Sequence, residues 1–149
     1  MTDDEFLCAF ERCTIARRDW THESHVRMAW LYLTRIPSDG EVFDRVRIGI
    51  KKLNSAFVRR QQMRCWPGPA KPKDPRGLDG YHETITVFFM RRLHQLMWEH
   101  NGARTAAEWV AILYPQCGMA SLQEYYTPEV LWSAGARAQW VEPDRKALK

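Results

Sequence analysis

Apolar residues recur three or four positions apart along most of this chain, and no segment alternates polar and apolar residues as a half-buried β-strand does. The clearest helical segment begins at His22, directly after Thr21, a residue type that caps helix N-termini. It ends before Pro37, which a helix interior does not tolerate. Its second half is apolar on nearly all sides, so we expect it to be the central helix.

Start and stop signals of the same kind divide the rest of the chain into helices. Thr2 precedes an acidic turn, Thr105 and Glu108 form a capping box, and Asn101-Gly102 is a helix-end signal. The sequence therefore predicts an all-α, single-domain helical bundle of about five main helices, with short helices near the C-terminus. The expected helices begin at residue 3 and cover 22–36, 41–60, 81–101 and 106–114, with a brief helix after Thr127 and a last one from Ser133 to Val141.

A proline-rich segment interrupts this helical pattern. Residues 65–77 contain four prolines and two glycines, so they cannot form a helix or a central strand. The chain of 149 residues has the size of one ordinary domain. We therefore predict one helical domain over residues 1–149 with a long, flexible, basic loop over about residues 62–79.

The net charge of +4 is concentrated in this loop and at the end of the helix before it. Between Arg59 and Asp79 there are six basic residues and two acidic ones, and the rest of the chain has 16 of each. Such a segment attracts anions, which makes it a candidate anion-binding loop. Its basic residues are Arg59, Arg60, Arg64, Lys71, Lys73 and Arg76.

The N-terminus and the cysteines indicate a cytoplasmic protein. Residues 1–5 are polar and acidic, and no apolar run approaches the roughly 18 residues of a membrane span. The four cysteines show no CxxC spacing, so they indicate neither a zinc knuckle nor a disulfide framework. We therefore expect free thiols and no association with a membrane.

Three histidines occupy the apolar faces of two expected helices. His22 and His25 are three positions apart, so both project from the same face of the central helix. His82 begins the apolar stripe of the helix over 81–101. If the two helix starts are neighbours, the three imidazoles meet in one polar site. Taken singly, each of them fits a capping or hydrogen-bonded core residue better than a ligand.

Three imidazoles with an open coordination position are the donor set of catalytic zinc, iron, manganese or copper sites. We therefore take His22, His25 and His82 as candidate ligands of a divalent transition metal. Helix N-termini carry positive partial charge and disfavour cations, although the same field keeps imidazoles neutral, as metal ligands must be.

Glu83 is the candidate catalytic residue of such a site. It adjoins His82, but consecutive residues on a helix point about 100° apart, which suits a general base or an orienting group better than a fourth ligand. Tyr81, Thr84 and Thr86 are the candidate substrate-binding residues. The chain lacks the common nucleotide-binding and hydrolase motifs, so a metal-dependent enzyme is a hypothesis without a named reaction.

Two histidine-bearing blocks resemble an uncharacterised family of small bacterial helical proteins. Residues 20–33 begin W-T-H-E-S-H, and residues 80–86 read G-Y-H-E-T-I-T. The closing run, from 125–131 to 136–137 and with 141–144, is similar as well. The resemblance implies that the two blocks occur together, which favours a joint site, but it implies no activity and does not include the basic loop.

Two other interpretations of the sequence stay open. In one, the same pocket and its two helix N-termini hold a small anion, such as a carboxylate or phosphate, without a metal. In the other, the basic loop docks on an acidic partner or on RNA. The absence of a known nucleic-acid-binding module and the balanced charge outside the loop argue against nucleic acid as the partner.

Overall fold

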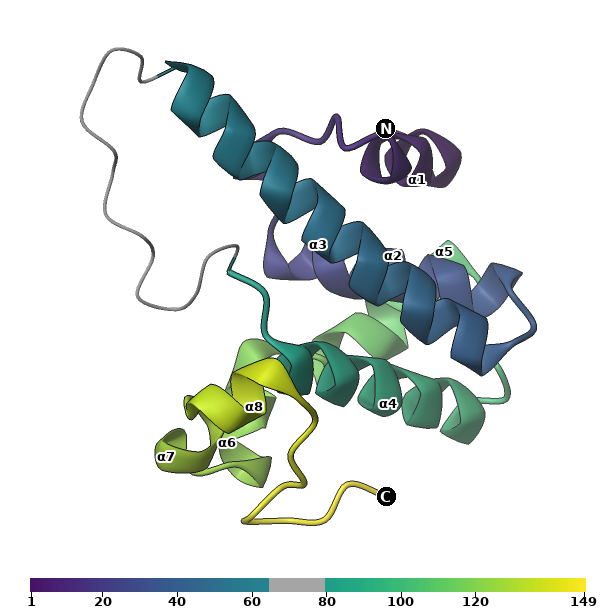
Figure 1. Cartoon of the computed structure of the whole chain (residues 1–149). Coiled ribbons are helices and arrows are strands. Elements are labelled where there is room, and N and C mark those ends of the chain that lie inside the picture. The colour runs from purple at the N-terminus through teal and green to yellow at the C-terminus, as the bar shows by residue number, and fades with distance from the viewer. Residues whose placement is uncertain (65–79) are drawn as a thin grey trace.

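The structure is a computed structural model that describes residues 1–64 and 80–149. Within these residues the chain is helical and contains no strand, which confirms the predicted all-α class (Figure 1). No helix in this part of the chain combines the length with the apolar composition of a membrane span. From residue 65 onward, the predicted basic loop lies outside the described residues.

Threonine caps fix the starts of the first two helices. Thr2 precedes α1 (Asp3–Glu11), and Thr21 precedes α2 (His22–Arg35). In both caps the hydroxyl oxygen accepts from the backbone N–H three residues later, and the side chain of that third residue accepts from the cap's own N–H. Both caps therefore satisfy backbone donors that the helix itself leaves unpaired.

The bundle is organised around α2, as the sequence predicts. This helix contacts α1 as well as α3 (Asp39–Arg64) and α4 (Glu83–Glu99). In Figure 1, α3 crosses the front of the molecule with α2 behind it and α4 below. Residues 28–33 of α2 are all buried, because neighbouring helices cover every side of this stretch.

Short helical turns follow α4, and the last of them pack against its start. The hydroxyl of Thr84 donates to the carbonyl of Gln139 at 2.9 Å and accepts from the N–H of Val141 at 3.1 Å. These bonds fix the C-terminal segment on α4. The short elements, in chain order and including one before α2, are η1 (Arg17–Asp19), α5 (Ala106–Glu108), η2 (Trp109–Leu113), η3 (Tyr114–Gln116), η4 (Met119–Ser121), α6 (Leu122–Tyr125), α7 (Pro128–Leu131) and α8 (Ala134–Ala138).

Several helix boundaries differ from those that the sequence predicts. α3 begins at Asp39 and continues to Arg64, so it extends beyond 41–60 at both ends. α4 begins at Glu83 because His82 is its N-cap. The expected helix to Tyr114 is a regular α-helix only over α5 and then widens into one turn of π-helix, η2. Pro115 has no N–H to donate to the carbonyl four residues earlier, so a regular α-helix cannot continue past it.

Gly49 lets α1 lie close against α3. The ring of Phe10 is 1% exposed and covers this glycine so closely that a Cβ atom added to Gly49 would lie 2.5 Å from two ring carbons. The same ring stacks on Trp20, with the ring centres 5.3 Å apart. A glycine inside a helix costs about 0.5–1 kcal/mol relative to alanine. Glycine is nevertheless needed at position 49, because any side chain there would overlap the ring of Phe10.

We expect the G49A substitution to lower the free energy of unfolding by about 1–3 kcal/mol, because the new methyl group overpacks the Phe10 ring. The matched control is G40A in the first turn of α3, where no heavy atom lies within 4 Å of the added Cβ. That variant should be as stable as the wild type or slightly more stable. Urea unfolding followed by circular dichroism measures both, and equal stability of the two variants would contradict the close approach of Phe10.

Candidate functional site

The structure brings His22, His25 and His82 to one cavity of about 370 Å³. We call it the histidine pocket. It lies where α2 and α4 begin, and its walls come from both helices, from α3 and from the short elements that follow α4. Its apolar lining includes Val26, Met28, Ala29, Val46, Ile50, Ile85, Phe89 and Met90.

One ring nitrogen of His22 is held by a hydrogen bond within the fold. Its Nε2 atom lies 2.6 Å from the carbonyl oxygen of Cys117, and its ring packs on Phe89 with the ring centres 4.7 Å apart. A carbonyl oxygen can only accept a hydrogen bond, so Nε2 carries the proton. In the neutral ring, Nδ1 is then an unprotonated acceptor.

His25 is held in the opposite tautomer. Its Nδ1 atom lies 2.6 Å from the carbonyl oxygen of Thr21, so this nitrogen carries the proton and Nε2 is the acceptor. The ring lies against Trp20 with the ring centres 4.0 Å apart. The pKa of His25 is lowered to about 4, mainly by burial and to a smaller extent by the nearby His22 and Arg17, while the Thr21 carbonyl acts in the opposite direction. His25 is therefore neutral at pH 7.

Both ring nitrogens of His82 are used within the fold. Nδ1 accepts from the backbone N–H of Ile85 at 3.2 Å and so caps α4, while Nε2 donates to the carbonyl of Leu131 at 2.7 Å. Burial is the main cause that lowers the pKa of His82. The edge of its ring meets Trp132, with the ring centres 5.8 Å apart. His82 therefore ties the start of α4 to the end of α7 and has no ring nitrogen left for a ligand.

Two arginines give the pocket a positive charge. Arg17 from η1 and Arg137 from α8 both line it, and neither guanidinium is paired with a carboxylate of the described residues. No aspartate or glutamate of that part of the chain lines the pocket. Trp132 and Met119 also line it and are 51% and 43% exposed, so its outer part combines apolar surface with unmatched positive charge.

Among the other predicted site residues that the structure describes, only Thr86 lines this pocket, and its hydroxyl donates to the carbonyl of His82 at 2.9 Å. Glu83 forms an ion pair with Arg47 at 2.6 Å and accepts a hydrogen bond from the hydroxyl of Tyr81. Burial is the main cause that raises the pKa of Tyr81, and the hydrogen bond to Glu83 adds to it. Thr84 is bonded to the C-terminal segment. Glu83 thus lies outside the lining of the histidine pocket, and its carboxylate is paired with Arg47.

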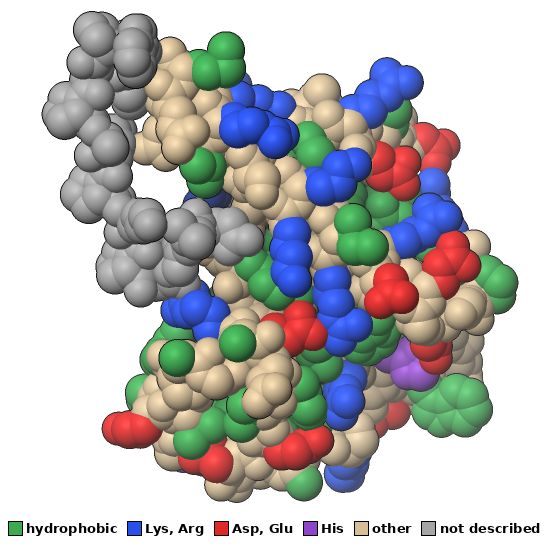
Figure 2. All heavy atoms as spheres, viewed as in Figure 1, with side chains coloured by type: hydrophobic (Ala, Val, Ile, Leu, Met, Phe, Trp, Pro, Cys, Tyr) green, Lys and Arg blue, Asp and Glu red, His purple; other side chains and the backbone are tan. Residues whose placement is uncertain are grey.

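The predicted anion-binding loop is described only at its start. Arg59 and Arg60 lie on the last turns of α3 rather than in a loop, and Arg60 donates to the carbonyls of Cys13 and Ile15. On the face shown in Figure 2, lysine and arginine side chains follow α3. The side chain of Arg64 and the residues Lys71, Lys73 and Arg76 lie outside the described part.

The three histidines, as they are bonded, fit a metal ion poorly. Only His22 and His25 keep an unprotonated nitrogen that the fold does not use, and the two arginines oppose a bound cation. In the described part of the chain, no three histidine, cysteine, aspartate or glutamate side chains are placed to hold a metal ion. Metal binding therefore stays a prediction from the sequence.

Comparisons with protein-family models, with curated proteins and with solved structures find no match to this chain. The resemblance of its two histidine blocks to small bacterial proteins also stays a prediction. What the pocket can bind must be inferred from its own residues.

Arg17 and Arg137 are the residues that sequence reasoning missed. Both lie in short segments without a strong helical pattern, and no motif connects them to the histidines. Their place in the pocket follows only from how η1 and α8 pack, so the sequence carried no usable signal for them.

The half-buried, neutral state of His25 predicts a loss of stability in mild acid. Its pKa is 6.5 in an unfolded chain and about 4 in the fold, so its contribution is complete above about pH 6.5 and disappears as the pH falls toward 4. The loss amounts to at most about 3 kcal/mol. Urea unfolding over this pH range should show a smaller decline in H25Q than in the wild type. The control H100Q, at an exposed histidine that ends α4, should decline like the wild type, and an unchanged decline in H25Q would contradict the burial of a neutral His25.

Proposed function

We propose that the protein binds a small organic acid with an apolar body in the histidine pocket, without a metal. The observation that supports this most directly is that two arginines line the cavity while, among the described residues, no carboxylate pairs with them or lines it. An anion is the ligand class that such a charge distribution favours. The hydrogen-bonding capacity of the guanidinium groups also suits a carboxylate or phosphate.

The walls of the pocket support an apolar body for this ligand. Residues such as Val26, Ile50 and Phe89 line it, and a cavity of about 370 Å³ lies at the small end of the range of roughly 300–1,000 Å³ for ligand pockets. A fully hydrophilic anion would leave these walls in contact with water and gain nothing from them. An aromatic or branched aliphatic acid would bury its body against them.

The tautomers of the histidines add a second requirement. His22 Nδ1 and His25 Nε2 are both hydrogen-bond acceptors, since the other nitrogen of each ring gives its proton to a carbonyl. A ligand that enters the pocket satisfies them best with a hydroxyl or N–H group. The preferred ligand therefore carries an acidic group for the arginines and a hydrogen-bond donor for the histidines.

Binding explains these residues better than catalysis does. A histidine whose pKa is about 4 is a weak general base at pH 7, where efficient bases titrate near the working pH. Glu83, the general base expected from the sequence, is occupied by Arg47 and Tyr81. We therefore propose a ligand-binding module, and we leave a metal-dependent enzyme as the alternative that the binding experiment can favour.

Calorimetric titration in the presence of a chelator tests the anion. The probe is 3-phenylpropionate, and its neutral amide is the matched ligand control. The R17Q and R137Q variants should each bind the acid about tenfold more weakly, since each removes a charged hydrogen-bond donor. R18Q is the matched protein control, because Arg18 is 88% exposed and does not line the pocket.

Two results would overturn the proposal. Equal binding of acid and amide would show that charge does not select the ligand. Binding of zinc, iron, manganese or copper by chelator-free protein, together with failure of every acid to bind, would favour the metal site expected from the sequence. Circular dichroism of each variant separates loss of binding from loss of folding.

A hydroxyl group on the probe tests the two acceptor nitrogens. We expect 3-(4-hydroxyphenyl)propionate to bind about two- to tenfold more tightly than 3-phenylpropionate, the effect of one added hydrogen bond. In the H22F/H25F double variant this gain should vanish, whereas the preference for acid over amide should remain. The phenyl rings preserve the contacts with Phe89 and Trp20. A gain that survives in the double variant would contradict the assigned acceptors.

A further inference from the structure

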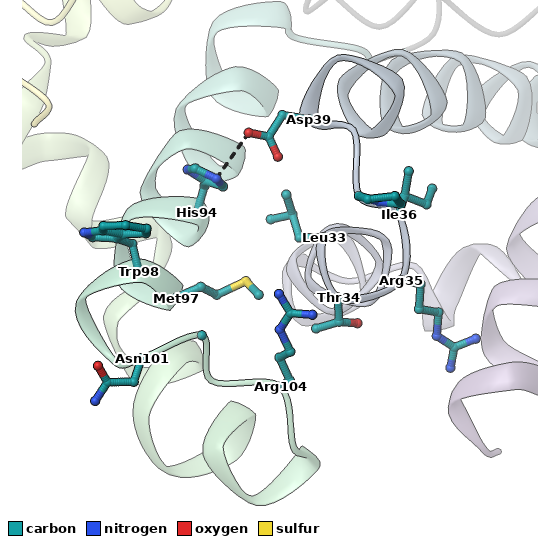
Figure 3. Close-up of a pocket in the computed structure, with 12 residues that line it drawn as sticks. Leu33, Thr34, Arg35, Ile36, Asp39, His94, Met97, Trp98, Asn101 and Arg104 are labelled. Carbon is teal, nitrogen blue, oxygen red and sulfur yellow. Dashed lines mark ion pairs between the residues drawn. The ribbon is translucent and has the colours of Figure 1, made fainter.

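A second and larger hollow lies at the opposite ends of α2 and α4 (Figure 3). Its volume is about 920 Å³, more than twice the 370 Å³ of the histidine pocket, and it shares no lining residue with that pocket. Its walls are the last turn of α2, the turn into α3, the second half of α4 and the loop over 101–104. We call it the helix-end groove and define it by Leu33, Ile36, His94, Met97, Trp98 and Arg104.

The groove joins an apolar floor to an exposed indole. In Figure 3, Leu33 and Met97 point into the space between the helices, and both are largely buried. Trp98 stands at the edge and is 84% exposed. A tryptophan left this open in the monomer is unusual, and tryptophan is among the residue types that dominate the energetics of protein interfaces.

One positive charge in the groove is unmatched. Arg104 reaches from the loop into the groove in Figure 3, and its guanidinium is paired with no carboxylate of the described residues. The other ionisable side chains of the wall already have partners. His94 faces Asp39 at 3.3 Å, and Arg35 binds Asp4 at 2.7 Å on the outer side. Among the described residues of the groove, Arg104 is therefore the charged group that can still pair with a partner, and it lies beside the apolar floor.

The loop that carries Arg104 is fixed before any partner binds. The N–H of Gly102 donates to the carbonyl of Met97 at 2.6 Å, and the indole N–H of Trp30 donates to the carbonyl of Ala103 at 3.4 Å. Asn101 and Gly102 both take left-handed backbone conformations, with φ of 55° and 75°, which turn the chain sharply after α4. A partner would spend little free energy on ordering this wall.

We propose that the helix-end groove docks a segment of a partner protein that presents an apolar side chain next to an aspartate or glutamate. The apolar side chain covers Leu33 and Met97, the carboxylate pairs with Arg104, and the indole of Trp98 packs over the segment. The size of the groove and the exposed indole at its edge favour a polypeptide over a small molecule. Arginine and tryptophan are the residue types that interface centres use most. This proposal does not depend on the ligand of the histidine pocket.

Selection from a displayed library of random twelve-residue peptides tests the docking site. The wild-type protein is the target, and the R104E variant removes peptides that bind elsewhere. We expect the recovered peptides to place aspartate or glutamate beside a large apolar residue. Recovery of basic peptides, or of no peptide above the background of an uncoated surface, would overturn the proposal.

Fluorescence anisotropy with a synthetic copy of one recovered peptide then measures the contribution of each residue. We expect binding to weaken about tenfold or more in R104E and in W98A, as for residues at the centre of an interface. R59E changes the net charge as R104E does but lies on α3 outside the groove, so it should bind like the wild type. Equal loss in R59E would indicate attraction by net charge alone and would refute the site. Because Trp98 and Arg104 are exposed, both variants should keep the helical circular dichroism of the wild type.

Discussion

Three hydrogen bonds from imidazole N–H groups to backbone carbonyls determine what the histidine pocket can bind. The acceptors belong to Thr21, Cys117 and Leu131, and a carbonyl oxygen leaves the imidazole no choice of tautomer. In the neutral rings of His22 and His25, the second nitrogen is then an unprotonated acceptor. Two of the three imidazoles thus offer an acceptor to a ligand, and Arg17 and Arg137 give the described part of the site its positive charge.

The shape of the pocket depends most on His82. Because its two nitrogens bond the N-terminus of α4 and the end of α7 at once, this residue sets where the C-terminal turns lie. Those turns carry Trp132 and Arg137 to the cavity. The residue that the sequence offered as a third ligand is thus the one that assembles the wall opposite α2. Its burial is a consequence of that structural role.

The sequence predicted the helices for clear physical reasons and offered the meeting of the three histidines as a hypothesis, but it could not predict how the histidines are bonded. The helix starts are marked by local signals, namely the capping residues Thr2 and Thr21 and the apolar stripe of α2. Each of these signals lies within one or two turns of helix. The acceptor of His22 lies 95 residues along the chain, and that of His82 lies 49 residues away. Those pairings follow from the packing of short turns that have little periodicity. The sequence does not predict the π-helical turn η2 for a similar reason, because Pro115 is the one local signal that bears on it.

The contact between Phe10 and Gly49 has a consequence for how sequences with this fold can vary. The ring occupies the space that any side chain at position 49 would need, so the two positions share one fixed volume. A larger residue at 49 requires a smaller one at 10, and the gap left by a smaller residue at 10 can be filled from 49. Across relatives of this chain, the two positions should therefore vary as a pair, and a library that randomises one of them alone would consist mostly of poorly folded members.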